Sequence, residues 1–123
     1  MDRREFDIRN GELMHLRNRL HTEQVALHDG KLKLSLIEAE MRVQIAQALN
    51  PETGKALYSN EALREAALLE MQDVQADWRQ TQVAVREGER KVAMTRATIE
   101  FTANELAYAI ARAAFDAEHE PQD

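Results

Sequence analysis

The chain has 123 residues, of which 44% are hydrophobic and only 5% aromatic, with 4 glycines, 2 prolines and no cysteine. This composition is typical of long helices or a coiled coil, and it excludes disulfides and thiol chemistry. The formal net charge of −6 argues against a dedicated nucleic-acid-binding protein, because such binding depends on neutralising phosphates. We expect an all-α chain that forms a single helical-hairpin domain.

The N-terminus and the hydropathy of the chain bear on its location. The first seven residues, Met-Asp-Arg-Arg-Glu-Phe-Asp, are charged and lack the apolar core of a signal peptide. No run approaches the roughly 18 apolar residues that a membrane span requires. We therefore expect a cytoplasmic protein that makes no membrane contact.

A seven-residue column of apolar side chains predicts the first helix, over residues about 4–49. This column contains Leu13, Leu20, Leu27, Leu34, Met41 and Ala48. A patchier column follows three residues later and contains Leu16, Glu23, Gly30, Ile37 and Gln44. Heptads sustained over this length indicate a coiled-coil seam.

A turn is predicted over residues 50–58. Pro51 cannot donate a backbone hydrogen bond and disfavours helix at the residue before it, so the first helix is expected to end there. Gly54 can adopt the positive φ that such a turn requires. Ser59 is the expected N-cap of the next helix.

The second helix is predicted over residues about 59–118, with one bulky and one small seam column. The bulky column contains Met71, Trp78, Val85, Val92, Ile99, Leu106 and Ala113. The small column contains Ala67, Val74, Thr81, Gly88, Thr95, Thr102 and Ala109. The pattern favours a continuous helix, with a bend near Gly88 as the alternative.

The two helices are predicted to pair in an antiparallel register set by the turn. A bend centred on Gly54 places Trp78 opposite Gly30, and Gly88 opposite Leu20. Each glycine would then make room for a large side chain across the seam.

Apolar side chains outside the seam predict self-association, because a two-helix hairpin cannot bury them. We expect a homo-oligomer. Its expected interface consists of Leu32, Leu36, Val43, Tyr108, Ile110 and Phe115.

Two groups of basic residues are candidates for contact with single-stranded DNA. The fold-back brings the basic residues near the N-terminus alongside those in the middle of the second helix. Acidic residues are interleaved with both groups, so a salt-bridged solvent face is the favoured alternative. The candidate residues are Arg17, Arg19, Arg86, Arg90, Lys91 and Arg96.

Glu12 and His15 have the Glu-x-x-His spacing found in di-iron helical bundles. That chemistry needs a second such motif or several facing carboxylates, and the chain has no second Glu-x-x-His. We therefore expect no metal, no cofactor and no catalytic residue. A metal-binding bundle enzyme is the distant alternative.

The turn region carries a resemblance. The stretch Gly54-Lys55-Ala56-Leu57-Tyr58-Ser59-Asn60-Glu61, followed by Arg64, resembles small helical-hairpin proteins encoded in phage and prophage genomes. The general layout is similar to the phage recombination-mediator family, whose short, all-helical, oligomeric members help load a recombinase on single-stranded DNA. No residue of that family can be carried over position by position, and this chain differs in being acidic.

Together these observations predict a long antiparallel helical hairpin, or coiled coil, that self-associates and acts by binding. The resemblance implies an accessory protein of DNA recombination or repair, with single-stranded DNA or a recombination protein as partner. The alternative is a structural or adaptor coiled coil that binds another protein without nucleic acid.

Overall fold

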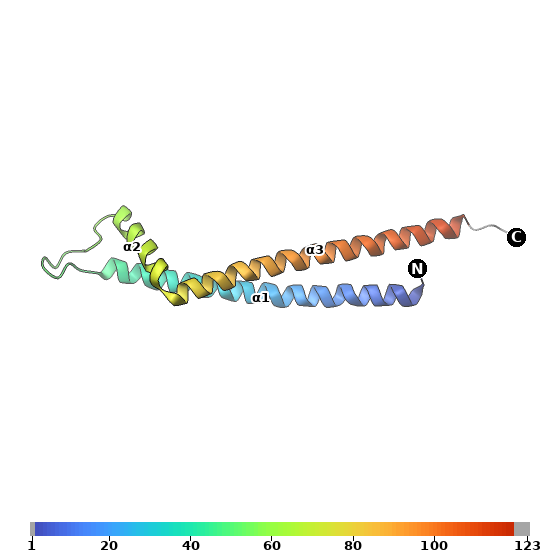
Figure 1. Cartoon of the computed structure of the whole chain (residues 1–123), viewed down its shortest axis with the longest axis horizontal. Coiled ribbons are helices and arrows are strands. Elements are labelled where there is room, and N and C mark those ends of the chain that lie inside the picture. Colours follow the sequence, from blue (N-terminus) through green and yellow to red (C-terminus); the bar gives the residue numbers. More distant parts are fainter. Residues whose placement is uncertain (1, 120–123) are drawn as a thin grey trace. The chain divides into compact units, whose positions relative to one another are not determined.

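The structure, a computed structural model, describes residues 2–119. Within this range the chain is helical and has no strand, which confirms the all-α class (Figure 1). The three helices are α1 (Arg3–Gln47), α2 (Glu61–Val74) and α3 (Ala76–Glu118).

The long helix α1 has a capped start. The Oδ1 atom of Asp2 accepts a hydrogen bond from the backbone N–H of Glu5 at 2.8 Å, which satisfies one of the free amides of the first turn. The helix ends at Gln47, a few residues before Pro51, so it stops earlier than its predicted end near residue 49.

The connector between α1 and α2 is a tight backbone loop. Asn50 donates its N–H to the carbonyl of Lys55 at 2.8 Å, and Leu57 donates to the carbonyl of Ala48 at 2.9 Å. Gly54 has a φ of 68°, which confirms the predicted positive φ.

The predicted cap of the second helix is wrong by one residue. Asn60, and not Ser59, is the N-cap of α2: its side chain accepts a hydrogen bond from the N–H of Leu63 at 2.9 Å. Asn60 has the extended conformation typical of an N-cap. In addition, Nη1 of Arg64 donates a hydrogen bond to the carbonyl of Tyr58 at 3.4 Å. Asn60 and Arg64 therefore both bond backbone groups at the start of this helix.

The prediction of one continuous second helix is also wrong. The helix is interrupted at Gln75, which has the extended backbone angles φ −84° and ψ 115°. Gly88 lies inside α3, where the helix is not interrupted. Gln75 joins the two helices through its backbone. Its N–H donates to the carbonyl of Met71 in α2 at 2.9 Å, and its own carbonyl accepts a hydrogen bond from the N–H of Arg79 in α3 at 3.2 Å. No proline or glycine stands at this position, so the sequence carries no local signal for the break.

Contacts divide the described chain into two units. Unit 1 comprises residues 2–25 and 89–119, and unit 2 comprises residues 26–88. In unit 1 the two segments run antiparallel, because Arg9 of α1 bonds Glu105 of α3 while Glu23, later in α1, bonds Thr95, earlier in α3. The buried side chains of unit 1 are Leu13, Val92, Thr95, Thr102 and Leu106.

Unit 2 holds the main apolar cluster. Met41 and Ile45 of α1 pack against Ala67 and Leu68 of α2, and all four are buried. The half-buried side chains around this cluster are Ile37, Tyr58, Met71 and Trp78. The core position predicted for Trp78 is therefore confirmed.

The predicted register of α3 against α1 is wrong by one heptad. A Cβ atom placed on Gly88 would lie 3.2 Å from Cδ1 of Leu27, and one placed on Gly30 would lie 3.4 Å from Cγ2 of Val85. Gly88 therefore faces Leu27 instead of Leu20, and Gly30 faces Val85 instead of Trp78. The pairing of bulky with small columns holds, because a shift of seven residues returns the same face of each helix to the seam.

The register differs because α2 crosses α1 steeply within unit 2 (Figure 1). Glu65 of α2 pairs with Arg42, and Trp78 of α3 pairs with Glu38. The chain thus advances 13 residues from Glu65 to Trp78 while their partners on α1 are only four residues apart. A helix that crosses its partner steeply adds residues to the chain without advancing along the partner's axis. This difference produces the one-heptad shift of α3 against α1. Val74, at the break, is left exposed and not in the seam as predicted.

Candidate functional site

The predicted nucleic-acid residues lie on exposed surface, five of them in unit 1. We call these five the basic band. The band consists of Arg17, Arg19, Arg90, Lys91 and Arg96. The sixth candidate, Arg86, is also exposed but belongs to unit 2.

The antiparallel pairing of unit 1 brings the two parts of the basic band together. The contact between Glu23 and Thr95 sets the segment that carries Arg17 and Arg19 beside the segment that carries Arg96. Residues 15–25 and 89–98 together hold five basic side chains and two acidic ones, Glu23 and Glu89. This part of unit 1 is therefore positive although the whole chain is acidic.

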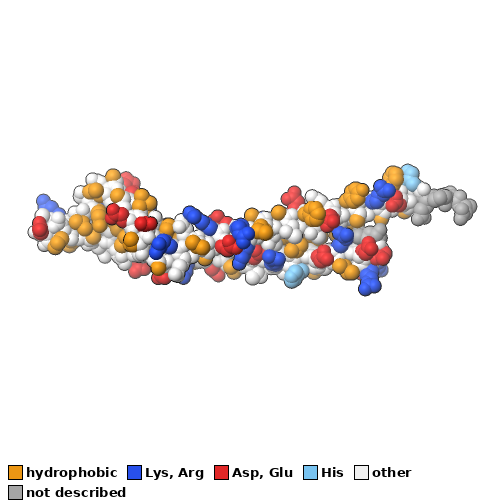
Figure 2. All heavy atoms as spheres, in the orientation of Figure 1, with side chains coloured by type: hydrophobic (Ala, Val, Ile, Leu, Met, Phe, Trp, Pro, Cys, Tyr) orange, Lys and Arg blue, Asp and Glu red, His pale blue; other side chains and the backbone are white. Residues whose placement is uncertain are grey.

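Part of that positive charge is engaged within the chain. The Nε atom of Arg19 lies 3.4 Å from Oε1 of Glu23, and Nη1 of Arg90 lies 3.4 Å from Sδ of Met94. Figure 2 shows basic and acidic side chains interspersed along the visible face. The interleaved charges favour a mixed surface over a continuous cationic track.

A carboxylate occupies the seam beneath the basic band. The side chain of Glu23 is only 12% exposed, and its Oε1 atom accepts a hydrogen bond from the Thr95 hydroxyl at 2.5 Å. Its Oε2 atom is buried without a protein partner. A polar group in a seam costs stability but favours the register that satisfies it, so this pair helps to fix the alignment of α1 and α3. The seam columns place both residues inward but do not show that they bond.

The six predicted interface residues are all exposed. They fall into two sets, one in each unit. Unit 2 carries Leu32, Leu36 and Val43, and unit 1 carries Tyr108, Ile110 and Phe115. The ring of Phe115 stacks on His119, with 4.1 Å between the ring centroids. All six side chains still keep about half or more of their surface exposed, which leaves that surface available to another molecule.

Two further exposed residues extend the unit 1 set. Met94 and Phe101 lie on α3 at seven-residue spacing from Tyr108 and Phe115. We call these four side chains the outer stripe. The predicted interface omits Met94 and Phe101, although their heptad spacing is visible in the sequence. Figure 2 shows hydrophobic side chains recurring along the upper edge of the C-terminal part of α3.

An ion pair on unit 2 links α1 to α2. Nη1 of Arg42 donates to Oε1 of Glu65 at 2.7 Å, and this hydrogen bond raises the pKa of the Arg42 guanidinium above its ordinary value. Both side chains are about half exposed, so water screens the pair and limits its contribution to stability. The pair lines a shallow hollow with Ile45, Glu61 and Arg64.

The structure offers no further support for metal chemistry at Glu12 and His15. Both are exposed on α1. Across residues 2–119, no three His, Asp or Glu side chains gather closely enough to hold a metal ion.

Among the helices described, none combines the length and the apolar character needed to cross a membrane.

Comparisons with protein-family models, with curated proteins and with solved structures find no significant match to this chain.

Proposed function

We propose that this protein is an oligomeric, non-catalytic coiled-coil accessory protein that acts by binding. The observation that supports it is the regular display of large apolar side chains outside the helix seam, in both units. Soluble chains rarely expose rows of this kind unless another molecule covers them. The alternative, an adaptor that uses the same rows for a different protein, predicts a chain that is monomeric by itself.

The mass in solution tests this proposal. Light scattering on the purified chain at micromolar concentration is expected to give at least twice the 14.1 kDa of one chain. The mass should persist in high salt, because the exposed rows are apolar and apolar contacts are not screened. A mass of 14.1 kDa under both conditions would refute self-association and favour the adaptor.

A second candidate function is supported by the basic band. In this proposal the assembled protein is a phage-type recombination or repair mediator that binds single-stranded DNA. Clustering several bands in one oligomer would strengthen binding through multivalency, which offsets the modest charge of each chain. The phage-like segment at the turn is consistent with this setting.

Fluorescence anisotropy with a labelled single-stranded oligonucleotide tests the DNA proposal. Replacing Arg17, Lys91 and Arg96 by Gln is expected to weaken binding by about tenfold or more and to reduce the salt slope by about 2 units. The charge-matched control replaces Arg3, Arg4 and Arg112 by Gln and should bind nearly as well as the unmodified chain. Equal loss in both triple variants, or no binding at low salt, would contradict a DNA site at the band.

A further inference from the structure

The outer face of α3 carries a second heptad pattern, separate from the seam. The outer stripe is well exposed: Met94 is 57%, Phe101 65%, Tyr108 70% and Phe115 53% exposed. A smaller exposed residue stands three positions after Met94, Phe101 and Tyr108. These smaller residues are Ala97, Asn104 and Ala111. Large and small residues therefore alternate at three- and four-residue steps, as the a and d positions of a coiled coil do.

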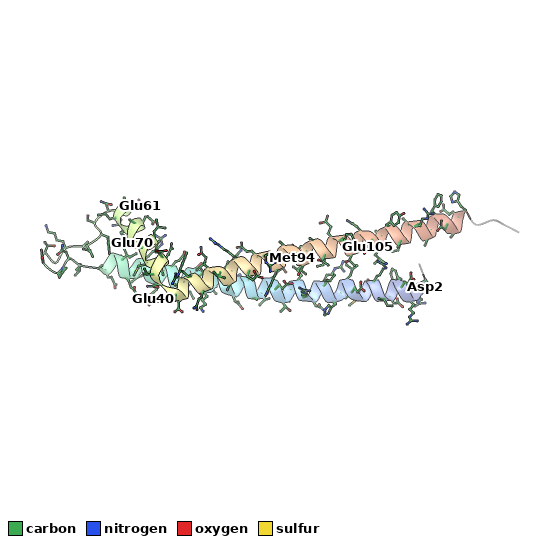
Figure 3. All side chains as sticks on the ribbon, in the orientation of Figure 1. Asp2, Glu40, Glu61, Glu70, Met94 and Glu105 are labelled. Atoms are coloured by element: carbon green, nitrogen blue, oxygen red, sulfur yellow. The ribbon has the colours of Figure 1, made fainter. Side chains whose placement is uncertain are left out.

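This pattern lies nearly opposite the seam. The seam side of α3 in unit 1 is buried at Val92, Thr95 and Leu106. At 3.6 residues per turn, the outer stripe and its smaller neighbours are centred roughly 180° away from those residues around the helix. The same helix thus has one face covered by α1 and a second, largely apolar face uncovered. Met94 and Glu105 both extend from α3 (Figure 3).

We propose that the outer stripe is the interface between two copies of this chain, which pack α3 against α3 in antiparallel orientation about a two-fold axis. This inference rests on the proposed self-association and assigns it a surface. A two-fold interface must be complementary to itself. The outer face meets that condition, because it carries both the large side chains and the smaller positions that can receive them.

The antiparallel orientation follows from the sizes of the side chains. In a parallel pair in register, each large residue meets its own copy, and Ala97 and Ala111 each meet an alanine, which leaves gaps at those layers. In an antiparallel pair, Met94, Phe101 and Tyr108 each meet a smaller residue of the other copy. One register sets Met94 over Ala111, Tyr108 over Ala97, and Phe101 over Asn104 of the second copy.

Two polar positions on this face fit the antiparallel register. Arg90 stands seven residues before Ala97 and faces Phe115 of the second copy, where a guanidinium on an aromatic ring is attractive. A parallel pair would instead set Arg90 against Arg90. The Asn104 residues of the two copies lie on either side of the two-fold axis, close to its centre. A single polar residue in such a face costs stability but fixes the register.

The acidic residues beside the stripe favour the same orientation. Residues that flank an a/d face decide the orientation of a coiled coil. A parallel pair would place Glu100 of each copy beside Glu105 of the other, which is repulsive. The antiparallel register places Glu100 opposite Ala107, and Glu105 opposite Thr98, so neither carboxylate meets another.

Over the span from Arg90 to Phe115 the antiparallel register contains one contact between like charges, which the two-fold axis repeats at the other end. Lys91 lies opposite Arg112 of the second copy, at the end of the overlap. The Nε atom of Arg112 lies 3.4 Å from Oδ1 of Asp116 in its own helix, which offsets its charge. Both Arg112 and Asp116 are more than half exposed, so water also screens this pair.

The exposed area is sufficient for a dimer. A fully buried aromatic side chain removes about 150–250 Å² from water, so three rings that are more than half exposed offer roughly 300–400 Å². With Met94 and the smaller residues between the rings, each copy contributes roughly 500–600 Å², and the pair buries about 1,000–1,200 Å², which reaches the range of specific interfaces.

The first test replaces Phe101 and Tyr108 by Glu. Sedimentation and light scattering should show that this double variant dissociates at least about 100-fold more readily than the unmodified chain, because two charges per copy would be buried at the centre of the interface. The matched control carries Ile8→Glu and Met14→Glu, which are also exposed in unit 1 but lie on α1. The control should keep the mass of the unmodified chain, and circular dichroism should show that both variants stay helical.

The outcomes separate this inference from the proposed function. An unmodified chain that is monomeric overturns both. An unmodified chain that is oligomeric, with a double variant that keeps the same mass, overturns the outer stripe alone. If the double variant dissociates and the control keeps the mass of the unmodified chain, the outer stripe is supported as the interface.

Cross-linking tests the orientation, since the chain has no cysteine of its own. The variants Met94→Cys and Ala111→Cys are oxidised separately and as a mixture. A disulfide-linked dimer is expected chiefly in the mixture, because these positions face each other across the two copies. Cross-linking of Ala111→Cys alone that equals or exceeds the mixture would overturn the antiparallel orientation.

Discussion

Leu68→Ala is expected to lower the free energy of unfolding by about 2–4 kcal/mol, whereas Leu69→Ala should change it by about 0.5 kcal/mol or less. The two leucines are neighbours on α2, but Leu68 is 4% exposed and Leu69 is 66% exposed. Leu68 packs with Met41 and Ile45 in the cluster of unit 2, so its truncation leaves a cavity. Leu69 contributes mainly its helix propensity, which Ala equals or exceeds.

Urea unfolding followed by circular dichroism measures the difference between these variants. All three proteins must be compared at one chain concentration, because self-association would add to the apparent stability. The pair is well matched, since the same side chain is removed from adjacent positions of one helix. Equal destabilisation by both substitutions would show that α2 does not dock on α1 through the face that contains Leu68.

Gly30→Leu should destabilise the protein by about 1–3 kcal/mol, because the added side chain overpacks the seam. Cγ2 of Val85 lies 3.4 Å from where the Cβ atom would be, which is ordinary contact distance for the Cβ atom itself. The three further carbons of a leucine would have to displace Val85 or turn out of the seam. The control is Gly11→Leu, on the same helix, where no atom lies within 4 Å of the new Cβ. Gly11→Leu is expected to stabilise α1 by up to about 1 kcal/mol through helix propensity.

A second substitution identifies which residue faces Gly30. Adding Val85→Ala to Gly30→Leu should recover part of the lost stability, because it opens space across the seam. Adding Trp78→Ala should instead lower stability further, since Trp78 packs against the cluster of unit 2 and donates its Nε1–H to Glu38. Rescue by Trp78→Ala and not by Val85→Ala would restore the register expected from the sequence and refute the one in the structure.

Much of the candidate site follows from the sequence. The positions of Leu32 and Tyr108 outside the seam columns are enough to predict that they are exposed, because a helix in a hairpin buries only one face. The outer stripe was only half predicted, since the predicted interface leaves out Met94 and Phe101. Which basic residues lie side by side depends on the pairing of α1 with α3, and that pairing is a tertiary property.

By itself the sequence determined the helical class, the inward faces of the helices away from the break at Gln75, and the turn. Few glycines and prolines, sustained heptads and the Pro51 to Gly54 segment act locally, so no distant contact is needed to interpret them. Only the tertiary structure decided the break at Gln75 and the register of α3. A heptad pattern is unchanged by a shift of seven residues, so it defines which faces meet but not which residues. The steep crossing of α2 and the Glu23–Thr95 hydrogen bond select one alignment, and both depend on residues far apart in the chain.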